Sequence, residues 1–177
     1  MRIISGTFRG KTIVPPNGFK ARPTTDFAKE SLFNILANRY RFDDLCALDL
    51  FAGTGSIGLE LASRGCRHIE AVEMNALHAA FIKKTGAELG FSQLHVVRLN
   101  VFDFLVLCKA RYDLIVADPP YDLAGIETLP ERLTGDILKP GGCLVLEHSA
   151  RYDFSTRPYF TERRRYGAVH FSFFVKP

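Results

Sequence analysis

Two short stretches of the sequence carry the residues whose types and spacing could do chemistry. The first runs from Asp49 to Gly58 and reads DLFAGTGSIG, and the second runs from Asp118 to Tyr121 and reads DPPY. Glycines let the backbone turn tightly and approach a ligand where a Cβ would clash. Carboxylates and carbonyls accept hydrogen bonds from an amine, and an aromatic ring can stack on a planar base. The first stretch therefore indicates a ligand-binding turn, and the second indicates a reaction site.

The glycine-rich stretch predicts a site for an adenosine-containing cofactor. It follows an apolar run and opens a helical pattern, the context in which Gly53 and Gly55 gain weight as a ligand turn. Glu73 ends the next apolar run, 20 residues after Gly53, where a carboxylate can accept hydrogen bonds from ribose hydroxyls. Asp49 suits a positively charged cofactor, such as the amino acid end of S-adenosylmethionine. We therefore favour a methyl donor over a dinucleotide; a glycine turn that only packs a helix on a strand is the alternative without a ligand.

The DPPY stretch predicts a site that holds the exocyclic amine of a planar base. Proline has a fixed φ and no amide hydrogen, so Pro119 and Pro120 stiffen the loop and turn its carbonyls outward. Asp118 and the Pro119 carbonyl could then accept hydrogen bonds from the NH2 group, while Tyr121 offers a face for stacking. Such acceptors favour the pyramidal nitrogen that attacks a sulfonium methyl in line. The alternative is a proline-capped strand end, and the five histidines show no metal-ligand spacing.

Alternating apolar runs and helical patterns must position both stretches. Strands are expected at residues 47–51, 70–74, 96–100, 114–118 and 143–147. Helices are expected at residues 56–64, 75–89 and 125–138, and a further helix should begin at a cap at Thr25 or Asp26. Strands separated by helices imply a parallel sheet covered on both faces, which makes the fold class α/β.

The two ends of the chain depart from this alternation. Residues 159–165 and 168–175 resemble a hairpin that closes the sheet with antiparallel strands. Residues 2–15 read as an extended pair broken by glycines. We therefore expect a single domain over residues 26–177, preceded by an N-terminal hairpin and basic extension over residues 1–25.

Composition excludes several classes of protein. The chain has 177 residues, 47% of them hydrophobic, and a formal net charge of +4, values that argue against disorder. No run approaches the roughly 20 apolar residues of a membrane span, and the start lacks the apolar stretch of a signal peptide. Four cysteines are scattered without a paired motif, so we expect buried free thiols in a reducing cytoplasm.

Charge is distributed unevenly along the chain. Residues 1–25 hold five basic residues and no acidic one, and residues 151–177 hold six basic and two acidic residues. Residues 26–150 hold 12 basic and 17 acidic residues. A mildly acidic body with basic ends indicates a polyanion that the ends contact, although solvated charged faces would look the same. Candidate phosphate contacts are Arg9, Lys11 and Arg22. For Arg163, Arg164 and Arg165 both interpretations stay open.

These motifs resemble a known family. Residues 49–58 together with DPPY are similar to class I S-adenosylmethionine-dependent methyltransferases that modify exocyclic amines. The segments ISG at 4–6, RGK at 9–11, RPTTD at 22–26 and ESLFNIL at 30–36 resemble the bacterial 16S ribosomal RNA guanine-N2 methyltransferase family. The resemblance implies a Rossmann-like fold with a seven-stranded, mostly parallel sheet. It also implies one guanine of 16S RNA as the target, within assembled or assembling small ribosomal subunits.

The resemblance also assigns roles to individual residues. It places the methyl donor against Asp49, Phe51, Gly53, Thr54, Gly55, Glu73 and Asn100. It places the guanine against Asp118, Pro119, Pro120 and Tyr121. The family has an acidic residue where Asn100 stands, and the amide oxygen can still accept the bond from the adenine amino group. The family also carries arginines where Phe27 and Ala28 stand.

Four other functions compete with this interpretation. An adenine-N6 DNA methyltransferase could use the same DPPY loop, but the chain has little room for a DNA recognition region. A methyltransferase that modifies a protein amide, such as glutamine, would favour Asn at the position that Asp118 occupies here. A non-catalytic RNA-binding assembly factor could keep the same fold, and a dehydrogenase lacks an evident hydride site. We expect a monomer, no membrane contact and a cytoplasmic location.

Overall fold

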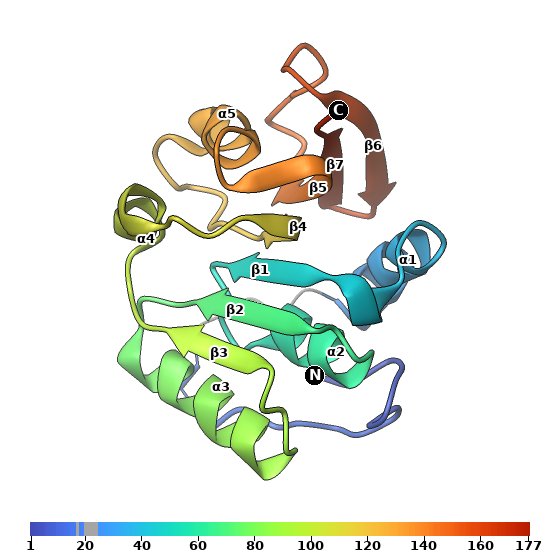
Figure 1. Cartoon of the computed structure of the whole chain (residues 1–177), viewed down its shortest axis with the longest axis vertical. Coiled ribbons are helices and arrows are strands. Elements are labelled where there is room, and N and C mark those ends of the chain that lie inside the picture. The colour runs from blue at the N-terminus through green and yellow to red at the C-terminus, as the bar shows by residue number, and fades with distance from the viewer. Residues whose placement is uncertain (17, 20–24) are drawn as a thin grey trace.

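A seven-stranded sheet forms the centre of the protein (Figure 1). The computed structural model describes residues 1–16, 18–19 and 25–177. The strands are β1 Cys46–Leu50, β2 His68–Val72, β3 Leu94–Val97, β4 Tyr112–Ala117, β5 Leu138–His148, β6 Phe160–Tyr166 and β7 Val169–Val175. They lie in the order β3-β2-β1-β4-β5-β7-β6, which makes β3 and β6 the edge strands. The first five run parallel, and β7 and β6 add an antiparallel hairpin.

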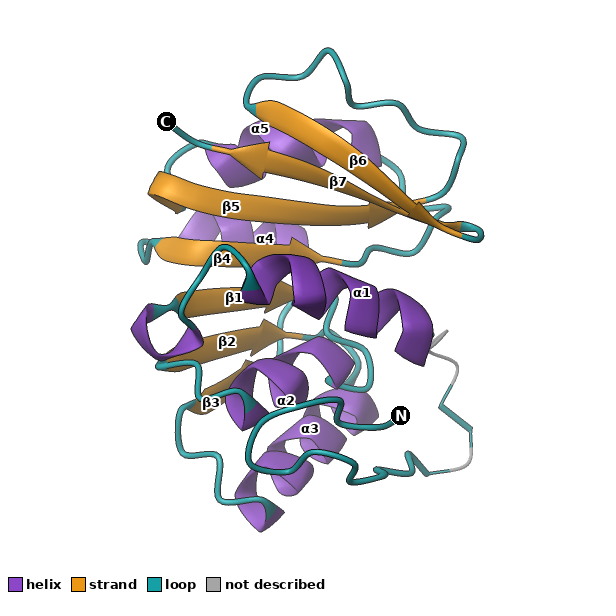
Figure 2. Cartoon of the chain, turned by 90° about the vertical axis from the view of Figure 1, so that its right-hand side faces the viewer, coloured by secondary structure: helices purple, strands orange, loops and turns teal. Residues whose placement is uncertain are grey.

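Helices cover both faces of the sheet (Figure 2). One face carries α1 (Asp26–Ala37), α2 (Ser56–Ser63) and α3 (Ala76–Glu88), and the other carries α4 (Val101–Leu107) and α5 (Leu129–Thr134). Two 3-10 turns, η1 (Phe42–Asp44) and η2 (Ile126–Thr128), lie in the connections. Successive side chains of a strand point to opposite faces. Buried side chains therefore divide into two main apolar clusters, one on each side of the sheet.

The expected α/β architecture is confirmed, with its parallel sheet and antiparallel C-terminal hairpin. The five expected strands, the expected hairpin and the helices at 26–37, 56–63 and 76–88 are present, and Thr25 caps α1 by accepting a hydrogen bond from Ala28 N. The strand expected at 96–100 is wrong in extent: β3 covers Leu94–Val97, because Asn100 caps α4. The helix expected over residues 125–138 is wrong in extent. Pro130 lacks the amide hydrogen that a helix interior needs, so it stands in the first turn of α5, which ends at Thr134. Helix α4 was not predicted, because a run of seven mostly apolar residues fits a strand equally well.

The N-terminal segment pairs with itself over a shorter length than expected. A single isolated bridge joins Arg2 and Thr12, and the Ile3 amide donates to the Lys11 carbonyl at 2.9 Å. The segment also packs closely on α2. A Cβ on Gly6 would lie 1.8 Å from the Ser63 carbonyl oxygen, so only glycine permits this approach. The extension is therefore a strap against α2 with one bridge.

Buried charges fix this strap to α2. The Glu60 carboxylate is fully buried and accepts hydrogen bonds from the Ile4 amide at 2.8 Å and the Ser5 amide at 3.0 Å. Lys29 of α1 lies 3.7 Å from the same carboxylate and donates to the Arg2 carbonyl. Arg64 contacts the other carboxylate oxygen at 2.8 Å. One buried anion thus joins the extension, α1 and α2.

Two features of composition can be checked on the described residues. None of the helices in this part of the chain has the length and apolar character that crossing a bilayer requires. Cys66 and Cys143 are buried free thiols, as expected. Cys46 and Cys108 are only half-buried, because Cys46 begins β1 and Cys108 ends α4, both at the margin of the core.

Candidate functional site

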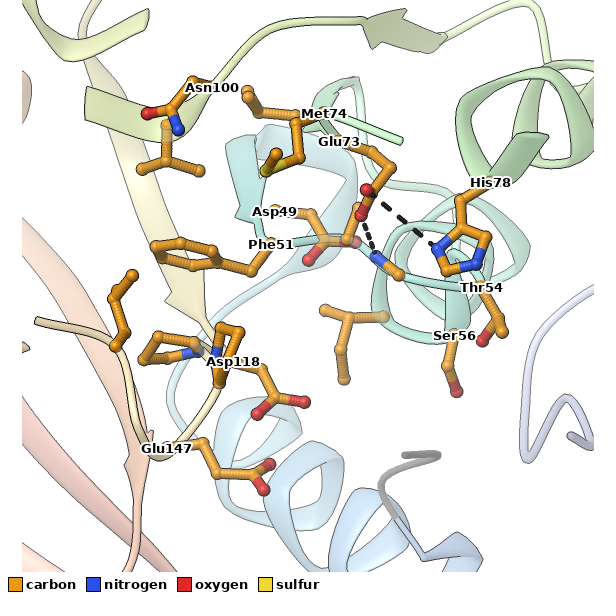
Figure 3. A pocket seen from close by; sticks show the side chains of 18 of the residues that line it. Asp49, Phe51, Thr54, Ser56, Glu73, Met74, His78, Asn100, Asp118 and Glu147 are labelled. Carbon is orange, nitrogen blue, oxygen red and sulfur yellow. Dashed lines mark hydrogen bonds and ion pairs between the residues drawn. The ribbon is translucent and has the colours of Figure 1, made fainter. Parts of the chain in front are cut away.

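A cavity of about 520 Å³ opens at the carboxyl ends of the parallel strands (Figure 3). It is lined by the loops after β1, β2, β3 and β4 and by the end of β5. Strand β1 pairs with β2 on one side and β4 on the other, so the chain changes direction across the sheet here. Ligands of open α/β sheets bind at such switch points. The volume falls in the range typical of small-molecule sites.

The turn after β1 holds an unusual backbone. Phe51 has φ of 61°, a left-handed conformation that costs a non-glycine residue energy, and its side chain lines the cavity. Gly55, with φ of 78°, precedes α2, and a Cβ there would lie 2.8 Å from Cγ1 of Ile82 in α3. Gly55 is not among the lining residues. Its structural role is thus to let α3 approach the turn, which differs from the cofactor contact expected of it.

Glu73 connects the turn to the end of β2. One of its carboxylate oxygens accepts a hydrogen bond from the Gly53 amide at 2.8 Å, and the other accepts from the Asn75 amide at 2.8 Å. His78 approaches the same carboxylate at 4.0 Å. These bonds fix the orientation of a carboxylate that is 8% exposed and lines the cavity. A carboxylate oxygen can accept more than one hydrogen bond, so Glu73 can still receive ribose hydroxyls.

Asp49 is a buried carboxylate at the end of β1. It is 2% exposed, and its Oδ2 accepts a hydrogen bond from the Gly58 amide at 2.9 Å. The pKa of Asp49 is raised to about 8: burial raises it most, the hydrogen bond from Gly58 lowers it, and the negative charges of Asp118 and Glu73 raise it. A cationic ligand beside Asp49 would stabilise its charged form.

Ser56 supplies a buried hydroxyl that the described residues do not satisfy. Its Oγ has no hydrogen-bond partner within the described part of the chain, and the residue is 9% exposed and lines the cavity at the first position of α2. Buried polar atoms are normally paired. A polar group of a bound ligand would complete this hydroxyl.

The DPPY loop reaches the cavity from the end of β4. The Asp118 amide donates to the Leu50 carbonyl at 3.3 Å, which ties the loop to β1. All four residues from Asp118 to Tyr121 line the cavity. The Tyr121 hydroxyl donates to Oε1 of Glu147 in β5 at 3.0 Å. Figure 3 shows the carboxylates of Asp118 and Glu147 directed toward the same region of the cavity.

The lining is strongly acidic. Among the described residues it contains four carboxylates, Asp49, Glu73, Asp118 and Glu147, and no lysine or arginine. A dinucleotide would bring a pyrophosphate to a lining that offers it no lysine or arginine, whereas a sulfonium with an amino acid end suits a lining of carboxylates. The cavity therefore fits a cationic, adenosine-bearing ligand.

The structure brings most of the predicted site residues together. Ten of them line the one cavity: Asp49, Phe51, Gly53, Thr54, Glu73, Asn100, Asp118, Pro119, Pro120 and Tyr121. Asn100 also caps α4, because its Oδ1 accepts a hydrogen bond from Phe102 N at 2.8 Å. The candidate RNA contacts Arg9 and Lys11 are exposed on the N-terminal strap, away from the lining, and Arg22 falls outside the described residues.

Sequence reasoning missed four polar lining residues: Thr25, which it assigned only as a helix cap, Ser56, His78 and Glu147. Ser56 directly follows the glycines. Polar side chains at the carboxyl ends of parallel strands line the ligand site, which we call the strand-end rule. Glu147 lies near the carboxyl end of β5, so this rule could have found it as it found Asp118. His148, the next residue, does not line the cavity. It is buried, with its ring nitrogens 2.8 Å from Ser172 Oγ and from the Ser149 carbonyl, and burial lowers its pKa.

Comparison with known proteins identifies relatives over most of the chain. Residues 1–175 match the family described as "Conserved hypothetical protein 95". The Ribosomal RNA small subunit methyltransferase D of Buchnera aphidicola subsp. Baizongia pistaciae is 30% identical over 148 residues, which cover 83% of this chain and 75% of that protein. The Escherichia coli K12 protein of the same name is 36% identical over 121 residues, covering 68% of this chain and 60% of that protein.

A solved structure agrees over nearly the whole length. A hypothetical protein of Thermus thermophilus superimposes with a TM-score of 0.86 at 30% sequence identity, covering 98% of each chain. The family match over residues 1–175 includes every residue that lines the cavity at the switch point. The chain therefore belongs to the conserved hypothetical protein 95 family, to which it is matched over residues 1–175, and is a relative of the ribosomal RNA small subunit methyltransferase D proteins.

Proposed function

We propose that the protein transfers a methyl group from S-adenosylmethionine to the exocyclic N2 amine of a guanine in 16S ribosomal RNA. The names of its relatives support methylation of small-subunit ribosomal RNA. The observation that carries the proposal is a single acidic cavity lined by both Glu73 and the DPPY loop. Glu73 is placed to accept hydrogen bonds from ribose hydroxyls, and the loop is placed to bind the amine. One ligand held by Glu73 and a second held by the loop would therefore lie within reach of each other.

S-adenosylmethionine supplies a methyl group on a positively charged sulfur. Glu73 would accept hydrogen bonds from its ribose hydroxyls, and Asp49 would face its amino group. The Ser56 hydroxyl, which has no hydrogen-bond partner among the described residues, would form a hydrogen bond with a polar group of the same ligand. Phe51, Gly53, Thr54 and Asn100 would border the rest of it, and Oδ1 of Asn100 keeps a lone pair for the adenine amino group beside its bond to Phe102 N. We propose that Gly55 supports the same turn indirectly, because its lack of a side chain lets α3 pack closely against the turn.

The DPPY loop would hold the guanine amine. Asp118 and the Pro119 carbonyl would each accept a hydrogen bond from the amine, which orients the nitrogen lone pair toward the methyl group. Pro120 keeps the loop stiff, and Tyr121 stacks on the base. The N–C bond forms as the C–S bond breaks, sulfur keeps the electron pair of that bond, and the surplus N2 proton is released to water. Positioning beside preorganised acceptors is the contribution of this chain.

Arg9, Lys11 and Arg22 would bind phosphates of the RNA. Such contacts supply affinity that falls with salt and carry no sequence information. We propose the small ribosomal subunit or its assembly intermediates as the partner, a monomer as the acting form, and the cytoplasm as the location.

Transfer of labelled methyl from S-adenosylmethionine tests the proposal. The acceptors are 30S particles that lack the modification, naked 16S RNA and duplex DNA, and digestion to nucleosides identifies the product. We expect N2-methylguanosine, formed on particles far faster than on DNA. N6-methyladenine in the DNA would establish the rival DNA activity instead. Absence of label from all three acceptors, with the donor shown to bind, would overturn the proposed acceptor.

A further inference from the structure

Glu147 is a cavity residue to which the proposed reaction gives no task. It lies near the end of β5, is 5% exposed, and lines the cavity with the DPPY loop. The Tyr121 hydroxyl donates to its Oε1 at 3.0 Å. In Figure 3 its carboxylate points toward the same region as the carboxylate of Asp118. The place where the target base would sit is therefore flanked by two carboxylates from neighbouring strands.

We propose that Glu147 reads the base: it accepts the hydrogen bond of guanine N1–H while Asp118 accepts that of N2–H. This inference rests on the proposed function and names the group that selects guanine at the same site. Guanine presents N1–H and N2–H2 side by side, two adjacent donors. A carboxylate only accepts hydrogen bonds when it is ionised, so the pair complements this edge in its ionised form.

The same pair disfavours adenine. Adenine presents an N6 amine beside N1, which is an acceptor without a hydrogen. Placing that acceptor against the Glu147 carboxylate sets lone pair against lone pair in a water-poor cavity, where an unmet polar group is costly. The DPPY loop can accept hydrogen bonds from any exocyclic amine. The choice between guanine and adenine must therefore come from the group beside the loop.

Tyr121 holds Glu147 in place for this task. Its hydroxyl donates to one carboxylate oxygen, and this bond uses one of the roughly four acceptor positions of a carboxylate. Parallel pairing of β5 with β4 sets Leu146 opposite Ala117, which brings the two strand ends that carry Glu147 and Asp118 together. The two carboxylates thus come from adjacent ends of a rigid sheet.

The test replaces the target guanine by 2-aminopurine, which keeps the 2-amino group and lacks N1–H. Reconstituted small subunits carry either base at the methylated position, and single-turnover transfer is measured for wild type and Glu147→Gln. We expect wild type to methylate guanine at least about 10²-fold faster than 2-aminopurine, since a site built to hydrogen-bond a group rejects the analogue without it. In Glu147→Gln, whose amide nitrogen can donate to N1, we expect the ratio to fall below about 10. Donor affinity and thermal unfolding should stay near wild type.

Tyr121→Phe separates base reading from simple anchoring. It keeps the ring and the Glu147 carboxylate but removes the bond that orients this carboxylate, so both bases should slow and the ratio should fall only part of the way, staying above that of Glu147→Gln. If Glu147→Gln left the ratio unchanged, Glu147 would only anchor Tyr121 and the inference would be wrong. Failure of the proposed function is a separate result, because wild type would then form no N2-methylguanosine on guanine particles.

Discussion

Asp118 stands at the point where donor and acceptor would meet, at the end of β4 and beside the cofactor turn. Its proposed role is to accept a hydrogen bond from the amine during the transfer. A positioned polar group of this kind contributes about 10²–10⁴-fold to rate. We therefore expect Asp118→Ala to lower single-turnover transfer by at least about 10²-fold while S-adenosylmethionine affinity changes by less than about threefold. A variant that kept more than about a tenth of the wild-type rate would rule out this role.

Asp49 should make stability depend on pH. Burial raises its pKa to about 8, far above the value of an unfolded aspartate, so the folded state binds a proton that the unfolded state has released. The free energy of unfolding then falls as pH rises from about 4 to 8. Asn needs no proton, so Asp49→Asn should be more stable than wild type by about 5 kcal/mol at pH 8 and should flatten this slope.

Denaturant unfolding at pH 5, 6, 7 and 8 measures the Asp49 effect. The matched control is Asp136→Asn, which removes an exposed carboxylate and should leave the wild-type slope intact. Parallel slopes for Asp49→Asn and wild type would show that Asp49 is ionised in the folded protein throughout this range.

At the scale of elements, the Glu60 carboxylate joins the N-terminal strap to α1 and α2. Removing one partner of a buried ion pair leaves an uncompensated charge. Lys29→Met should therefore lower the free energy of unfolding by about 2–3 kcal/mol, less than a fully isolated pair would lose because Arg64 still contacts Glu60 at 2.8 Å.

Chemical denaturation checks the Lys29 prediction against Lys84→Met. Lys84 forms an exposed pair with Glu88 on α3, and such surface pairs contribute little. Hydrogen exchange of the Ile4 and Ser5 amides should also speed up in Lys29→Met, because both donate to Glu60. An equal loss of stability in both variants would contradict the special position of Lys29.

Local signals made part of this structure predictable. The strands, the Thr25 cap and the meeting of Glu73 with Gly53 follow from apolar runs, capping chemistry and the strand-end rule. The short helices α4 and α5 did not follow, because runs of six or seven residues carry too little periodicity. Gly55 and Glu147 depend on neighbours distant in sequence, Ile82 and Tyr121, so their roles needed the folded chain.

For the whole molecule, the uneven charge predicts how RNA binding responds to salt. Arg9→Ala, Lys11→Ala and Arg22→Ala combined should weaken binding to 16S RNA and reduce the slope of log affinity against log salt by about two, since each phosphate contact contributes roughly 0.7–0.9. S-adenosylmethionine affinity should stay unchanged, because Arg9 and Lys11 do not line the cavity.

A control variant removes three exposed basic residues that lie outside the strap. Arg41, Lys109 and Arg111 precede the amino ends of β1 and β4, opposite the cavity. Their combined change to Ala alters net charge by the same amount and should change RNA affinity less than the first set does. Equal effects of both sets would indicate a general response to charge and contradict a strap that binds RNA.

Strand β6 closes the sheet, and within the described part of the chain no further strand pairs with its outer backbone groups. Arg163, Arg164 and Arg165 stand exposed along this strand, and charged side chains on an edge strand oppose its pairing with another molecule. The arginine run should therefore oppose association between copies of the protein. Variants with threonine at all three positions should precipitate sooner than wild type as concentrated stocks.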